Sequence, residues 1–171
     1  IAKWLWAFCS EQEQSAMLHS EDDYAFRLAC ENGHLEIAKW LWIICPDDQK
    51  SEMLHENDDD AFGSACENGH LKTAKWLWQV CPDLEKPTML NAKDNYAFCL
   101  ACQRGHIELA KWLWAICPDQ EQSTMLHAND NYAFLVACQN GHLEIAKWLW
   151  AICPDQEQSA MLHSEDNYAF R

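Results

Sequence analysis

A five-residue string, Ala-Lys-Trp-Leu-Trp, returns along the chain at a fixed interval and limits what the chain can fold into. It begins at Ala2, Ala38, Ala74, Ala110 and Ala146. Each copy therefore starts 36 residues after the one before, with no insertion or deletion between copies. A constant period between about 20 and 50 residues is typical of stacked supersecondary units. We expect a repeat array in which each unit packs against its neighbours.

Each unit carries two helical patterns separated by a glycine. The first pattern follows Asp22, a residue suited to cap a helix, and ends at Asn32-Gly33, where glycine readily adopts the left-handed conformation. The second covers residues 34–45 and is stopped by Pro46. Two short helices joined by such a turn form an antiparallel hairpin. The apolar content of the first helix comes from Tyr24, Ala25, Phe26, Leu28, Ala29 and Cys30.

The second helix of the unit has an unusually broad apolar surface. At about 100° per residue its apolar arc spans about 200°, roughly twice what a helix packed on one surface needs. Trp40 and Trp42 lie at opposite edges of this arc. We therefore expect the tryptophans to form contacts between repeats, and the alternative is an exposed aromatic stripe that binds a ligand. The expected inter-repeat residues are Trp4, Trp6, Trp40, Trp42, Trp76, Trp78, Trp112, Trp114, Trp148 and Trp150.

These patterns predict one domain over residues 1–171, an all-α solenoid of stacked helix-turn-helix repeats with long linkers. The expected units are partial repeats at 1–22 and 167–171 and full repeats at 23–58, 59–94, 95–130 and 131–166.

The hairpin over residues 24–42 resembles the ankyrin repeat, whose sequence reads roughly TPLHxAAxxGHxxIVxxLL followed by an acidic residue or Asn. The matching positions are Phe26 at the first Leu, Ala29-Cys30, Gly33-His34, Ile37-Ala38, Leu41-Trp42 and the closing Asp47. The GHLE…AKWL wording is similar to divergent ankyrin arrays of giant DNA viruses and protists. The resemblance implies a non-enzymatic scaffold for protein–protein interactions, in which His34 braces the turn.

Two features depart from the ankyrin pattern. The TPLH tetrapeptide is missing, and the period exceeds the usual 33 residues because the linker 47–59 is long. That linker has no glycine for a tight β-finger but carries Met53-Leu54, which we expect to anchor a short helical turn against the hairpin ends. Tetratricopeptide and pentatricopeptide arrays have related helical units and remain the rival assignment, although the Gly-His and Ile-Ala-x-x-Leu pattern favours ankyrin.

The charge of the chain narrows its partners. Twelve basic residues against 27 acidic ones give a formal net charge of −15. Nucleic-acid binders neutralise phosphates with Lys and Arg, so this charge argues against nucleic acids and, likewise, against anionic membranes. No apolar run approaches the ~20 residues of a membrane span. Protein partners, basic ones among them, fit the charge best.

The ten cysteines recur at two positions of the repeat, and only Cys99 stands outside this pattern. Equivalent positions in stacked helices lie about 10 Å apart, whereas a disulfide needs Cα atoms within about 7 Å. We therefore expect reduced, buried thiols and a cytoplasmic, reducing location. The two sets are Cys30, Cys66, Cys102, Cys138 and Cys9, Cys45, Cys81, Cys117, Cys153.

No residue pattern predicts a cofactor, a metal site or a catalytic centre. Cys30 and His34 supply half a zinc site, but zinc requires four ligands. Residues 57–60 lack the glycine and terminal Glu of an EF-hand loop, and helix capping explains their acidity better. The G-x-S-x-G elbow and Gly-rich phosphate loops of common enzymes are absent. Four linker histidines are interpreted as surface or linker-packing residues: His19, His55, His127 and His163.

Comparison of the copies within the chain indicates where a partner could bind. In ankyrin-like stacks, the exposed side of the first helix and the adjoining linker form a concave recognition face. The position of Arg27 varies strongly between copies, although neutral drift explains such variation as well. The candidate protein-binding residues are Arg27, Glu31, Gly63, Cys99, Arg104 and Leu135.

A structural role is the alternative function. Both ends of the sequence are cut within a hairpin and neither shows a polar capping repeat. Uncapped solenoid ends present apolar surface and tend to stack, although a longer parent chain explains the missing caps equally well. The alternative is therefore a protein that assembles with copies of itself, end to end or laterally, into a filament or tube.

Overall fold

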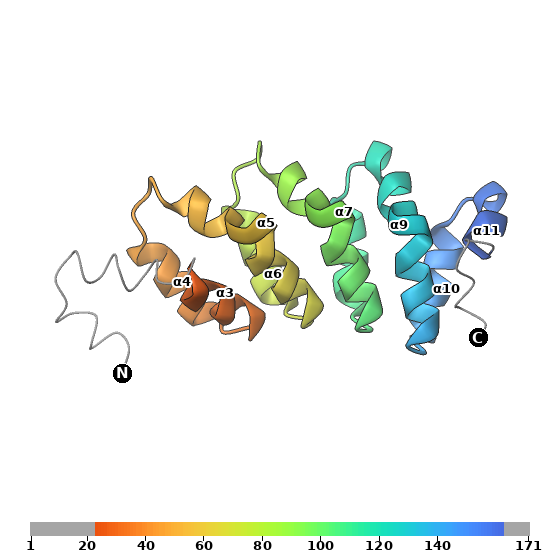
Figure 1. Cartoon of the computed structure of the whole chain (residues 1–171), viewed down its shortest axis with the longest axis horizontal. Coiled ribbons are helices and arrows are strands. Elements are labelled where there is room, and N and C mark those ends of the chain that lie inside the picture. Colours follow the sequence, from red (N-terminus) through yellow and green to blue (C-terminus); the bar gives the residue numbers. More distant parts are fainter. Residues whose placement is uncertain (1–22, 163–171) are drawn as a thin grey trace.

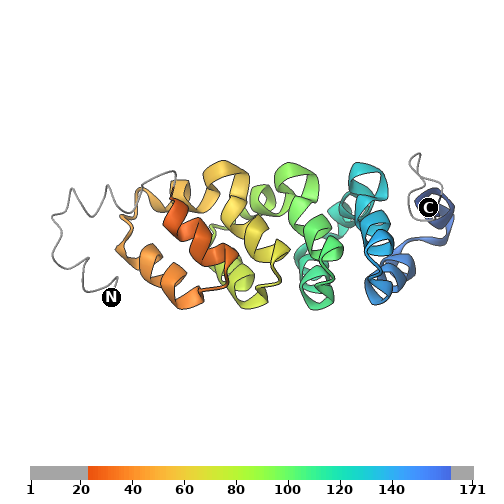
Figure 2. The same ribbon diagram turned by 60° about the horizontal axis from the view of Figure 1, so that its bottom comes forward.

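The computed structural model describes residues 23–162, which form a row of helical hairpins lying side by side (Figures 1 and 2). These residues contain helices and connecting turns but no strand. The fold is therefore the all-α solenoid that the period predicts. Its helices are α3 (Tyr24–Glu31), α4 (Leu35–Ile44), α5 (Lys50–Glu67), α6 (Leu71–Val80), α7 (Lys86–Gln103), α8 (Ile107–Ile116), α9 (Asp119–Gln139), α10 (Leu143–Ile152) and α11 (Asp155–Leu162).

The glycine turns close the hairpins α3–α4, α5–α6, α7–α8 and α9–α10. At the first turn Gly33 has a φ of 68°, and the N–H of His34 donates to the carbonyl of Ala29 at 2.8 Å. The next repeat packs directly on this turn, because a Cβ added to Gly33 would lie 2.5 Å from Nδ1 of His70. At each turn covered in this way glycine is needed for two reasons. The backbone is left-handed, and the histidine ring of the next repeat leaves no room for a side chain.

The turn histidines also bond across repeats. Nε2 of His106 donates to the carbonyl of Glu67 at 3.0 Å, and Nε2 of His142 donates to the carbonyl of Gln103 at 2.9 Å. Both carbonyls belong to the preceding repeat. The histidine of the Gly-His pair thus satisfies a carbonyl at the end of a helix in the preceding repeat, α5 for His106 and α7 for His142.

The long helices α5, α7 and α9 each consist of two helices joined by a left-handed turn. In α5 this turn is formed by Asn57, Asp58 and Asp59, whose φ angles are 54°, 58° and 63°. The short helix that precedes it buries Met53 and Leu54 completely, which confirms the predicted anchor. In the described residues this helix and turn lie where the ankyrin resemblance implies a β-finger.

Helix capping is a poor account of the acidic residues in these linkers. Asp23 precedes α3 but has a left-handed φ of 56°, and its side chain makes no capping hydrogen bond. Asp59, in the equivalent place, is buried within the left-handed turn. Capping by a side chain is therefore not seen at Asp23, and Asp22 lies outside the described residues. Asn57, Asp58 and Asp59 form a left-handed turn, and the Asp59 carboxylate bonds to His55. Asx side chains suit N-caps and left-handed turns alike, so the sequence did not separate the two.

The core runs along the row and is built from the same positions in every repeat. Phe26, Cys30 and Ala38 are completely buried, as are Cys66 and Ala74 at equivalent positions. The nine cysteines of the described residues are free, and all but Cys138 are buried. None of the helices described between residues 23 and 162 has the length and apolar character needed to cross a membrane.

Aromatic rings meet at each boundary between described repeats. The ring centroid of Trp42 lies 6.2 Å from that of Trp76 in the next repeat, at an interplanar angle of 87°. Phe26 lies 6.3 Å from Trp42 and 6.2 Å from Trp76. This Phe-Trp-Trp cluster recurs as Phe62–Trp78–Trp112 and Phe98–Trp114–Trp148. Trp4 and Trp6 lie outside the described residues.

Candidate protein-binding surface

Tyrosines line one side of the inner helices, which are α3, residues 60–67 of α5, residues 96–103 of α7 and residues 132–139 of α9. Tyr24, Tyr96 and Tyr132 occupy the same place in their repeats and are 46%, 44% and 37% exposed. Tyr24 was assigned to the apolar content of the helix, but it lies outside the core, and the guanidinium carbon of Arg27 lies 5.5 Å from the centroid of its ring. Asp60 holds this position in the remaining repeat. A position that accepts either Tyr or Asp is not a core position, and this was the signal available in the sequence.

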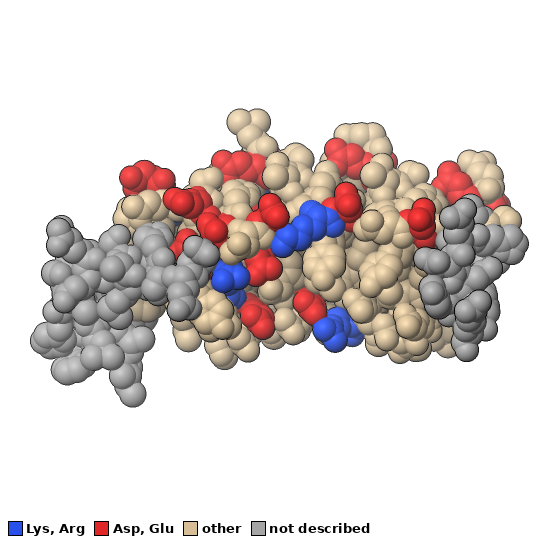
Figure 3. All heavy atoms as spheres, in the orientation of Figure 1, with Lys and Arg blue, Asp and Glu red and all other residues tan. Residues whose placement is uncertain are grey.

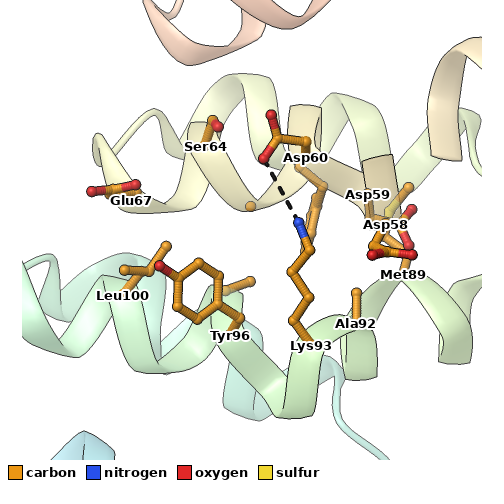
Figure 4. A pocket seen from close by; sticks show the side chains of 13 residues that line it. Asp58, Asp59, Asp60, Ser64, Glu67, Met89, Ala92, Lys93, Tyr96 and Leu100 are labelled. Atoms are coloured by element: carbon orange, nitrogen blue, oxygen red, sulfur yellow. Dashed lines mark ion pairs between the residues drawn. The ribbon is translucent and has the colours of Figure 1, made fainter. Parts of the chain in front are cut away.

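A small pocket of about 40 Å³ opens between α5 and α7 (Figure 4). Gly63 forms part of its wall, and a Cβ placed there would meet nothing within 4 Å. Tyr96 and Leu100 line the pocket from α7, and Asp60, Ser64 and Glu67 line it from α5. The pocket exists because the second repeat has glycine where its neighbours have larger side chains.

Ion pairs connect neighbouring repeats around this pocket. Asp60 accepts a hydrogen bond from the Arg27 guanidinium at 2.9 Å and lies 3.9 Å from Nζ of Lys93. Arg104 pairs with Glu67 at 2.5 Å. Figure 3 shows a few basic side chains among acidic ones on this face, with further acidic side chains along the upper edge of the row. We define the inner-helix surface as the exposed tyrosines, the Gly63 pocket and its flanking acidic residues Asp60 and Glu67.

The six residues predicted to bind a partner fall into different environments. Glu31 and Arg104 are exposed, and Arg27, Gly63 and Leu135 are partly buried. Cys99 is only 1% exposed, so its prediction as a surface contact is wrong. The thiol of Cys99 ends one bond beyond Cβ. At the equivalent position of the first repeat, the longer side chain of Arg27 reaches Asp60 of the next repeat. The structure brings Arg27 and Gly63 near Asp60 but gives no such grouping to Leu135.

Two groups of side chains have the composition of a metal site. The ligand atoms of His55, Cys81 and Glu85 all lie within 4.8 Å of one another, and those of His127, Cys153 and Glu157 do the same. Burial, followed by the carboxylates of Glu85 and Asp59, raises the pKa of the Cys81 thiol to about 11. Sequence analysis missed these groups because their members are up to 30 residues apart. The signal was the recurrence of His, Cys and Glu at the same three positions.

The sequence model of the family described as "Ankyrin repeats (3 copies)" matches residues 26–119 and 64–161, which together cover most of the chain. No curated protein matches the chain. Among solved structures, an ankyrin repeat family protein from Legionella pneumophila is 26% identical, with a TM-score of 0.70. The match covers 87% of this chain but only 40% of that protein. The family match and the Gly-His hairpins place the chain in the ankyrin-repeat family.

Proposed function

We propose that the chain is a non-enzymatic scaffold that binds a protein segment along the inner-helix surface. The observation that carries the proposal is the row of exposed tyrosines interrupted by the Gly63 pocket. A tyrosine ring offers a large rigid contact area together with a polar hydroxyl, and such residues dominate binding hot spots. Ankyrin repeats are generally protein–protein interaction modules, and this supports the assignment.

The chemistry of the surface favours a partner segment that combines basic and apolar side chains. Asp60 and Glu67 flank the pocket, and the whole chain has a formal charge of −15. A lysine or arginine of the partner would compete with Arg27, Lys93 and Arg104 for these carboxylates. The same cation would stack on a tyrosine face, and an apolar side chain would enter beside Gly63. The same charge disfavours nucleic acids and anionic membranes as partners.

Peptide display on the immobilised protein tests this proposal. We expect the selected peptides to be enriched in Lys or Arg beside an apolar residue. Their binding should fall at least ten-fold for Tyr96→Ala, because the loss of an anchoring ring costs about 1.4 kcal/mol or more. Leu84→Ser is the matched control, since Leu84 is 94% exposed and lies outside the inner-helix surface. Peptides that bind Tyr96→Ala as well as the wild type, or that lack basic residues, would refute the proposal.

We also infer a reducing, cytoplasmic location. Its support is the set of nine free cysteines in the described residues. Alkylation of the protein in lysate from its native source, followed by mass spectrometry, should find every one of these thiols reduced. Disulfides among them would exclude this location.

A further inference from the structure

The two His-Cys-Glu groups join three consecutive segments of the stack. His55 comes from the short linker helix at the start of α5, Cys81 follows the end of α6, and Glu85 precedes α7. Nε2 of His55 lies 2.8 Å from Oε2 of Glu85. Nε2 of His127 lies 2.7 Å from Oε2 of Glu157 in the second group. Cys81 and Cys153 are each 3% exposed, while both histidines are partly buried.

A buried partner fixes the orientation of each histidine. Nδ1 of His55 lies 2.5 Å from the carboxylate of Asp59, and Nδ1 of His127 lies 2.5 Å from Oδ1 of Asn131. An ionised carboxylate only accepts hydrogen bonds, and the amide oxygen at the equivalent position does the same. Nδ1 therefore carries a proton in both groups. This leaves Nε2 facing the carboxylate of Glu85 or Glu157. Histidine ligands of metal sites are oriented in the same way, through a hydrogen bond at their other ring nitrogen.

We propose that His55, Cys81 and Glu85, and likewise His127, Cys153 and Glu157, each bind one divalent transition-metal ion, with Zn²⁺ preferred. A thiolate and an imidazole nitrogen favour zinc over Mg²⁺ or Ca²⁺, and a carboxylate oxygen is a common third ligand. Tetrahedral bonds of about 2.0–2.3 Å separate ligand atoms by roughly 3.3–3.6 Å. The ligand atoms of each group already lie within 4.8 Å of one another. Water completes the fourth position.

Binding changes the charge and the protonation of each group. The thiol of Cys81 releases its proton to solvent when it becomes a ligand. The ion then neutralises the thiolate and the nearby carboxylate of Glu85, while Asp59 keeps its hydrogen bond to Nδ1 of His55. In known zinc sites, too, the ligating histidine is held in its orientation by a hydrogen bond at its other ring nitrogen.

The chain contains its own comparison for this proposal. In the intervening repeat the equivalent residues are Asn91, Cys117 and Glu121, so an amide stands in place of the histidine. Nδ2 of Asn91 donates to Oε2 of Glu121 at 3.0 Å. The amide oxygen of Asn95, equivalent to Asp59, is buried and has no hydrogen-bond partner. This repeat therefore lacks both the nitrogen ligand and the hydrogen bond that would orient it.

Titration of tag-free, reduced, metal-free protein with Co²⁺ tests the proposal. Cobalt bound to a thiolate gives a charge-transfer absorption, and competition with Zn²⁺ should remove it. We expect two Co²⁺ per chain for the wild type, one for His55→Asn and none for the double variant His55→Asn/His127→Asn. These substitutions copy the Asn91 repeat, so the fold already accommodates them. Circular dichroism should confirm unchanged helicity.

Three further variants make the assignment specific. Asn91→His should raise the stoichiometry to three, because it restores the third His-Cys-Glu group. Cys81→Ser should remove one cobalt–thiolate absorption, and Cys117→Ser, its matched control, should leave two. The proposal is overturned if the wild type shows no cobalt–thiolate absorption. It is equally overturned if the stoichiometry does not change in His55→Asn/His127→Asn or in Asn91→His.

Discussion

Gly69 and Gly63 belong to the same hairpin, but their surroundings differ completely. Gly69 has a φ of 76°, and a Cβ at this position would lie 2.6 Å from the ring of His106. Gly69→Ala should destabilise the protein by about 2–4 kcal/mol, through left-handed strain and displacement of a histidine that bonds to Glu67. Urea unfolding followed by circular dichroism measures this loss. A stability within about 0.5 kcal/mol of the wild type would contradict the packing described.

Gly63 is the matched position at which alanine should have the opposite effect. It lies within helix α5, and its added Cβ would meet no atom within 4 Å. Gly63→Ala should therefore stabilise the protein by about 0.5–1 kcal/mol through helix propensity alone. The same methyl group narrows the pocket and should weaken binding of the selected peptides. Destabilisation by Gly63→Ala would show that the wall of the pocket is closed rather than open.

The buried thiols give stability a dependence on alkaline pH. Burial raises the pKa of Cys30 from its ordinary value of 9.0 to about 12. A group whose pKa is higher in the folded state contributes stability that is complete below pH 9.0 and is lost as the pH rises towards 12. The urea midpoint should therefore fall over this range. Cys30→Ala should show a smaller fall, and an equal fall in both proteins would assign the effect to other groups.

The left-handed turns within α5, α7 and α9 are the elements in which backbone conformation and residue type conflict most. Asp130 in α9 is exposed and has a φ of 56°. Glycine at this position removes the steric cost, and a β-branched side chain increases it. We expect Asp130→Gly to stabilise the protein by about 0.5 kcal/mol and Asp130→Val to destabilise it by about 1–2 kcal/mol. Thermal melts of the two variants provide the comparison, and Val equal to Gly would contradict this turn geometry.

The residues that repeat with the 36-residue period predicted the helices well. Features that depend on local backbone conformation or on the stacking of repeats were not predicted. The second helix was predicted over residues 34–45 and is α4, Leu35–Ile44, because glycine and proline mark its limits. The linker helix followed from the Met-Leu pair. The left-handed turn escaped prediction because Asn57 and Asp58 suit caps and turns equally. The metal-ligand groups also escaped it, since Cys81 and Glu85 approach His55 only through the stacking of repeats.

At the scale of the whole molecule, the stack is held by contacts between immediate neighbours. Hydrogen bonds between repeats join residues 30 to 39 positions apart, as from His55 to Glu85 and from His106 to Glu67. Such an array has no single central core, so its stability depends on each interface between repeats. The aromatic clusters lie at these interfaces, whereas the exposed tyrosines lie on the inner-helix surface. We therefore expect the tryptophans to join the repeats and the tyrosines to bind a partner.

The thermal melt of Trp76→Ala, with Tyr96→Ala as its control, tests this claim most directly. Trp76 contacts Phe26 and Trp42 across a repeat boundary, with ring centroids 6.2 Å away in both cases. Truncation should cost about 3–5 kcal/mol and lower the Tm by roughly 10 °C. Tyr96→Ala should keep a Tm near that of the wild type while it loses peptide binding. An unchanged Tm for Trp76→Ala together with lost peptide binding would reverse the two roles and contradict the account.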